Sequence, residues 1–127
     1  MYLNSIIDQS PTRVFKVATA LTGGQFTVVK LGENGVATAG ANDVPVGVLT
    51  AETELPQAVG EDVNVQIVGS SMAYVGEAVK AGDLLAAGAD GKLVKATSGK
   101  FIFARALENA AANVVAHIQI LNAGYAA

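Results

Sequence analysis

Residues 23–35, GGQFTVVKLGENG, and residues 82–91, GDLLAAGADG, open two copies of one pattern of short β-strands and turns. In each copy a strand that follows glycine runs to a turn, at Asn34-Gly35 in the first copy and at Asp90-Gly91 in the second. Asn-Gly and Asp-Gly pairs accept the positive φ that both central positions of a tight hairpin need. The repeat therefore predicts two related sets of β-hairpins.

Each copy closes on an alternating segment, residues 63–68 (VNVQIV) and residues 115–120 (VAHIQI). Apolar side chains at every second residue are typical of a strand with one face in a core. Alanine favours helices, but the 14 glycines interrupt every stretch of helical length. We therefore expect an all-β protein, a small β-barrel or β-tulip-like sandwich of about eight to ten short strands. At most one short helical turn is expected, at residues 76–82.

The composition indicates a surface that binds other proteins. Hydrophobic residues make up 51% of the chain and charged residues only 15%, outside the usual range for a solitary soluble domain. Such a chain either buries surface in an oligomer or docks on a larger object, unless alanine raises the apolar count without forming patches. The net charge of −3 predicts no nucleic-acid partner, because phosphate backbones attract basic surfaces. The short apolar runs predict no membrane span.

We expect residues 1–12 to form an N-terminal arm and residues 13–127 a single β domain. Ser10-Pro11 separates the arm from a strand expected at residues 14–18. A disordered tail is the alternative, but tails rarely carry several large apolar side chains. The arm lacks the basic start and long apolar stretch of a signal peptide, so we expect synthesis in the cytosol. Its large apolar residues, the predicted contacts with a neighbour, are Tyr2, Leu3, Ile6 and Ile7.

The sequence contains no motif for catalysis, so we expect a protein that is not an enzyme and has no catalytic, metal-binding or cofactor-binding residues. There is one histidine and no cysteine, whereas metal sites need clustered ligands. His117 is interpreted as an interface or surface residue, because the sequence indicates no orienting carboxylate for it. Ser70-Ser71 follows a strand but lacks the second glycine of a nucleophile elbow. The acidic loop at 52–62 lacks the spacing of a calcium loop.

Several segments resemble the small capsid cement proteins, or head decoration proteins, of tailed phages. The resemblance covers most of the chain from about residue 14 onward. The segments that carry it are residues 46–50 (VGVLT), 76–85 (GEAVKAGDLL), 89–94 (ADGKLV), 102–108 (IFARALE) and 114–121.

The resemblance implies a β-rich homotrimer that binds the major capsid protein on the outer surface of a phage head. Members of the family hold neighbouring capsid subunits against the pressure of packaged DNA and have no catalytic residues. The resemblance thus implies a virion component on the capsid exterior, made in the host cytoplasm. In that setting the apolar residues of the arm would contact the capsid or a neighbouring chain.

Two alternatives remain open on the sequence. The chain could be another virion component, such as a tail protein or a fibre-attachment protein. It could also be a non-catalytic carrier or binding domain of biotinyl type. Such a domain presents a lysine in a tight hairpin flanked by methionine, whereas Lys92 follows Asp90-Gly91 without a neighbouring methionine.

Overall fold

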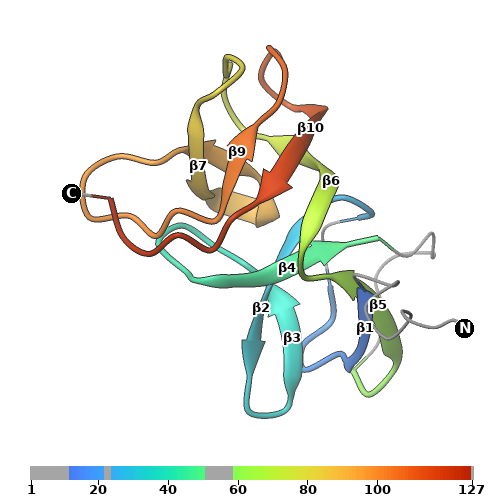
Figure 1. The fold of residues 1–127 in the computed structure, drawn as a ribbon. Coiled ribbons are helices and arrows are strands. Elements are labelled where there is room, and N and C mark those ends of the chain that lie inside the picture. Colours follow the sequence, from blue (N-terminus) through green and yellow to red (C-terminus); the bar gives the residue numbers. More distant parts are fainter. Residues whose placement is uncertain (1–11, 22–23, 51–58, 127) are drawn as a thin grey trace, which may run out of the picture.

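The computed structural model describes residues 12–21, 24–50 and 59–126, and that part of the chain contains ten β-strands (Figure 1). The prediction of an all-β fold is confirmed. A 3-10 turn, η2 (Ala89–Gly91), connects two of the strands. The strands are β1 (Thr12–Lys16), β2 (Val28–Gly32), β3 (Gly35–Thr38), β4 (Pro45–Leu49), β5 (Asp62–Gln66), β6 (Gly69–Val75), β7 (Leu84–Ala87), β8 (Leu93–Lys95), β9 (Ala104–Ala106) and β10 (Val114–Ile120).

The first five strands form one sheet in the order β1-β5-β4-β2-β3, which we call the N-terminal unit (Figure 1, lower half). All neighbouring strands in it run antiparallel. Beyond the end of β1, Val17 forms a parallel bridge with Val36 of β3. The two edge strands thus meet at one end, and the sheet curves towards a barrel.

The last five strands form a closed barrel, which we call the C-terminal barrel (Figure 1, upper half). Strand β10 pairs with β6 over its whole length, from Val114 opposite Val75 to Ile120 opposite Gly69. The barrel closes through a parallel contact between Val75 of β6 and Leu93 of β8. The predicted small barrel is therefore present in this half of the chain.

The two units have the same strand order, so the predicted repeat is confirmed and extends to β1 and β6. The strands of the N-terminal unit follow the order β1-β5-β4-β2-β3. The strands of the barrel, read from β6, follow the matching order β6-β10-β9-β7-β8. The closing contacts correspond as well. The Ala18 N–H donates to the Val36 carbonyl at 2.8 Å, and the Gly76 N–H donates to the Leu93 carbonyl at 2.7 Å. Each unit is closed by a single parallel pair, Val17 with Val36 in the N-terminal unit and Val75 with Leu93 in the barrel.

Two strands of the N-terminal unit contribute to both hydrophobic cores. Val29 and Leu49 belong to the core of their own unit. Their neighbours Val28 and Val48 belong to the core of the C-terminal barrel. All four are at most 1% exposed, as expected where successive side chains of a strand point to opposite faces and both faces are covered. Strands β2 and β4 therefore lie between the two cores and join the units.

Three local predictions are corrected by the structure. The first hairpin turn is centred on Glu33 and Asn34, because Gly32 pairs with Gly35 and Gly35 already belongs to β3. Gly35 is needed there for close packing, since a Cβ atom on it would overlap the Lys16 carbonyl. Residues 76–82 form no helical turn, because Val79 instead makes an isolated antiparallel bridge with Ala110, in the β9–β10 connection. Strand β1 begins at Thr12, two residues before the predicted start.

The predicted turn at Asp90-Gly91 is confirmed, with φ of 58° and 74° at the two residues. Gly91 is buried, and its N–H donates to the Ala39 carbonyl of the N-terminal unit at 2.8 Å. A Cβ atom on Gly91 would lie 2.9 Å from Cβ of Thr27 and 3.1 Å from the Val28 carbonyl oxygen. Glycine is thus required here both for the left-handed backbone and for the contact between the units.

Replacing Gly91 with valine is therefore expected to destabilise the protein more than the same change at Gly99. Gly99 also has a positive φ, of 84°, but a Cβ atom there would meet nothing within 4 Å. The left-handed conformation should cost about 1–2 kcal/mol in either variant, and overpacking should add about 1–3 kcal/mol only in Gly91→Val. Urea unfolding measures the free energy of unfolding of each variant. Equal losses in the two variants would contradict the packing of this turn between the units.

Candidate functional site

The four residues predicted to make contacts, Tyr2, Leu3, Ile6 and Ile7, lie outside the described residues, so they stay a prediction. The acidic loop at 52–62 is also described only in part. At its end Asp62 of β5 pairs with Lys16 of β1, with Nζ 2.8 Å from Oδ1. This ion pair is exposed and lies across two neighbouring strands, so it is worth little to stability.

His117 has a carboxylate partner that the sequence analysis missed. Its Nδ1 lies 3.0 Å from Oε2 of Glu108, and its backbone N–H donates to the same oxygen at 2.9 Å. The backbone N–H and then the side chain of His117 lower the pKa of Glu108. Both side chains are exposed, in agreement with the interpretation of His117 as a surface residue. The signal in the sequence was a glutamate nine positions earlier, brought back by the β9–β10 connection.

Ser71 is not arranged to work with this pair. In the β6–β10 register Ser71 lies opposite Ile118, whereas His117 lies opposite Met72. Directly paired residues share a face of the sheet, so Ser71 points to the core side with Ile118 and His117 to the outside. A nucleophile and a base on opposite faces cannot exchange a proton directly.

Within residues 12–21, 24–50 and 59–126, no three His, Cys, Asp or Glu side chains are grouped closely enough to hold a metal ion. Over those residues no helix has the length and apolar character needed to cross a membrane.

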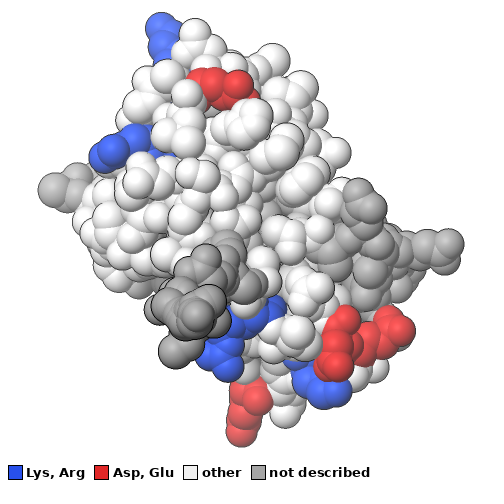
Figure 2. Space-filling model, turned by 45° about the vertical axis from the view of Figure 1, so that its right-hand side comes forward, with Lys and Arg blue, Asp and Glu red and all other residues white. Residues whose placement is uncertain are grey.

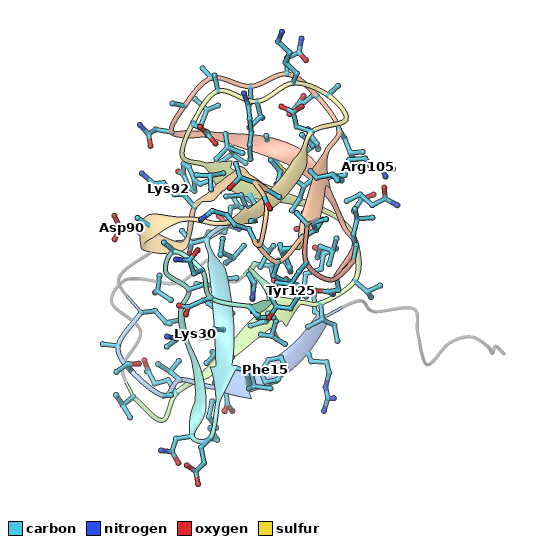
Figure 3. The ribbon with its side chains drawn as sticks, turned by 90° about the vertical axis from the view of Figure 1, so that its left-hand side faces the viewer. Phe15, Lys30, Asp90, Lys92, Arg105 and Tyr125 are labelled. Carbon is cyan, nitrogen blue, oxygen red and sulfur yellow. The ribbon has the colours of Figure 1, made fainter. Side chains whose placement is uncertain are left out.

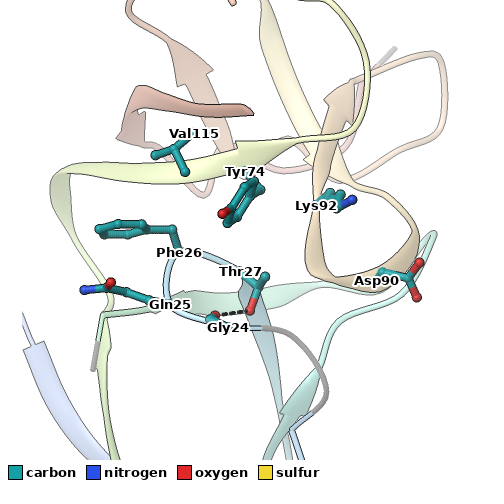
Figure 4. Close-up of a pocket in the computed structure, with 8 residues that line it drawn as sticks. All are labelled: Gly24, Gln25, Phe26, Thr27, Tyr74, Asp90, Lys92 and Val115. Atoms are coloured by element: carbon teal, nitrogen blue, oxygen red, sulfur yellow. Dashed lines mark hydrogen bonds between the residues drawn. The ribbon is translucent and has the colours of Figure 1, made fainter. Parts of the chain in front are cut away.

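A groove of about 590 Å³ opens at the junction of the two units (Figure 4). Phe26, Tyr74 and Val115 form its apolar part, with Gln25 at one end. The Tyr74 N–H donates to the Phe26 carbonyl at 2.9 Å, so backbone atoms tie the units together within the groove. No pattern in the sequence predicts this groove, because its walls come from segments far apart in the chain.

The other end of the groove is polar. Asp90 and Lys92 line it from the β7–β8 turn and project on the same side of the molecule (Figure 3). Lys92 Nζ donates to Oδ1 of Asn113 at 3.0 Å, which orients its ammonium group. A carboxylate and an ammonium group two residues apart give this end no net charge.

Much of the described surface is uncharged. On the face seen in Figure 2, charged side chains gather at the end formed by β1, β2, β3 and β5, and most of the rest carries no charge. Large apolar side chains are exposed at several separate places, among them Val14 on β1, Leu84 on β7 and Tyr125 near the C-terminus. Such a surface suits contact with other protein chains more than with a charged polymer.

Comparison with known proteins adds one finding. No family profile and no curated protein sequence matches the chain. Among solved structures, the fold is similar to that of the N base of the head fibre gp8.5 of bacteriophage phi29, with a TM-score of 0.66 and 18% sequence identity. The match covers 91% of this chain and 98% of the phage protein. At this identity the likeness shows a shared fold, and it includes both units.

Since the fold lowers the pKa of Glu108, ionised Glu108 stabilises the folded state. This contribution is present above the ordinary pKa of a glutamate and is lost as the pH falls through the lowered value. We expect the difference in melting temperature between wild type and Glu108→Gln to be largest above about pH 5 and to vanish in stronger acid.

The matched control is His117→Ala, which keeps the backbone N–H that contributes most to the shift. NMR titration of the Glu108 carboxyl should still give a lowered pKa in that variant. An unshifted pKa in the wild type would contradict the geometry of the pair.

Proposed function

We propose that this protein is a structural component of a phage head that binds the outer surface of the shell as a decoration, or cement, protein. The observation that carries the proposal is the similarity of the whole two-unit fold to the base of a phage head fibre. That protein is described as part of a head fibre, and the match covers 98% of it. The resemblance of the sequence to head decoration proteins leads independently to the same class.

The surface supports this role. Only 15% of the chain is charged, and the exposed apolar side chains would lose contact with water on a protein shell. A ligand that binds only the assembled shell stabilises it by RT ln(1 + [L]/Kd), about 2.7 kcal/mol per site at about 100 times Kd. Repeated over many sites, this contribution can protect a whole head without any catalytic step. The proposed role is accordingly not enzymatic and needs no cofactor or metal.

A second candidate is a base that attaches a fibre to the head. It is favoured by the matched protein being the N base of a head fibre. In both roles the partner is the major capsid protein, and the difference is whether this chain also holds a further protein. Both roles place the protein on the exterior of the virion.

The test is binding of the purified protein to heads that lack it. We expect saturable binding to mature, expanded heads and a higher temperature of DNA release once they are saturated. Co-sedimentation and thermal release of DNA measure these two effects. A protein that does not co-sediment with heads would contradict both roles, and one that binds without raising the release temperature would leave only the attachment role.

The proposed arm is tested in the same assay. A variant with Tyr2, Leu3, Ile6 and Ile7 changed to serine keeps the length of the chain. Losing two buried side chains at about 1.5 kcal/mol each should weaken binding by at least about tenfold. Deleting residues 1–11 is the companion variant, because it leaves β1 complete. Unchanged affinity in both variants would contradict a contact through the arm.

The proposed trimer is tested on the free protein. Light scattering at micromolar concentration should give about three times the 12.8 kDa mass of the chain. A stable interface should bury roughly 800 Å² per partner, so the trimer should persist on dilution. A mass of 12.8 kDa at this concentration would contradict a trimer in solution.

A further inference from the structure

Phe26 has a backbone conformation that a bulky side chain rarely adopts. Its φ is +71°, in the left-handed region, where an aromatic residue is strained. The corresponding residue of the second unit is Gly82, with a φ of +93°. The correspondence rests on matching hydrogen bonds. The Phe26 N–H donates to the Leu49 carbonyl at 2.6 Å, and the Gly82 N–H donates to the Ala106 carbonyl at 2.8 Å.

The turn before the strand thus requires a positive φ in both units, and the second unit meets the requirement with glycine. Glycine adopts this conformation without strain, so the fold alone would favour it at position 26 as well. The Phe26 ring is only partly buried and belongs to neither hydrophobic core. Strain that the fold does not need is commonly kept where a side chain has a function.

The Phe26 ring lies in the groove between the units, where it forms an apolar floor with Tyr74 and Val115 (Figure 4). Tyr74 adds a hydroxyl that can donate and accept hydrogen bonds. At one end of the groove Gln25 offers an amide, whose Nε2 also donates to the Thr50 carbonyl at 3.0 Å. At the other end Asp90 offers a carboxylate and Lys92 an ammonium group, which keeps further donors beside its bond to Asn113. A ligand of the groove would therefore have an apolar face and several hydrogen-bonding groups.

The charges and the strand pairing narrow the class of ligand. Asp90 and Lys92 carry opposite charges, so the groove has no excess of one sign with which to select an anion or a cation. An extended peptide would need a free strand edge for backbone pairing. Strand β6 is already paired with β10 and β8, and β2 with β3 and β4. The ligand must then be recognised by side chains.

We propose that this groove binds a neutral oligosaccharide. Sugar rings have an apolar C–H face that can pack on the rings of Phe26 and Tyr74. Their hydroxyls both donate and accept, which matches the amide of Gln25 and the opposite charges of Asp90 and Lys92. A volume of about 590 Å³ suits two or three sugar rings. This activity is separate from binding to a head and would give a surface-bound protein an affinity for glycans.

The test compares the wild type with Phe26→Gly and Phe26→Leu on an array of neutral and anionic glycans. Phe26→Gly removes the ring and relieves the strain, so its melting temperature should stay within about 5 °C of the wild type. Phe26→Leu keeps an apolar side chain but removes the aromatic face. Tyr125→Leu is the matched control, because this aromatic residue is exposed and does not line the groove.

We expect the wild type and Tyr125→Leu to bind neutral glycans, and both Phe26 variants to bind them at least about tenfold more weakly. Binding to heads should be the same in both Phe26 variants as in the wild type. The proposal is overturned if the wild type binds no glycan, if it binds only anionic glycans, or if Phe26→Leu binds as well as the wild type. It is also overturned if the Phe26 variants lose binding to heads, because the groove would then be a protein contact.

Discussion

The structure depends on strands β2 and β4 being buried on both faces. In each strand two adjacent apolar residues point to opposite sides, Val28 and Val29 in β2, and Val48 and Leu49 in β4, so that each core receives one of each pair. The core of the C-terminal barrel is incomplete without the N-terminal unit, because separating the units would expose Val28 and Val48 to water at about 1.5 kcal/mol or more each. The two halves of the repeat therefore form one cooperative structure.

The groove follows from the same arrangement. Backbone hydrogen bonds join the units at two places, from the Gly91 N–H to the Ala39 carbonyl and from the Tyr74 N–H to the Phe26 carbonyl. These contacts fix the distance between the walls before any ligand binds, and a preformed site loses less entropy on binding. A protein that rests on a shell can in this way present a second surface that is independent of the contact with the shell.

The candidate sites were hard to predict because their residues meet only in the folded chain. Glu108 and His117 are nine positions apart and become partners through the β9–β10 connection. Phe26, Tyr74 and Val115 come from the turn before β2, from β6 and from β10. The glycines that open the two copies of the repeat do not correspond in the structure. Gly24 lies two residues before Phe26, which is the residue that corresponds to Gly82. Only the matching hydrogen bonds reveal that Phe26 occupies the position of a glycine.

The sequence by itself determined the all-β class, the internal repeat and the turn at Asp90-Gly91. These features depend on neighbours in the chain: apolar residues at every second position, glycines that interrupt helices, and residue types that tolerate a positive φ. Tertiary structure alone decided the closure of the barrel through Val75 and Leu93, the sharing of β2 and β4 between two cores, and the groove. These features join residues far apart in sequence, and they depend on which face of a strand is covered, a choice that side-chain packing makes only once both units are folded.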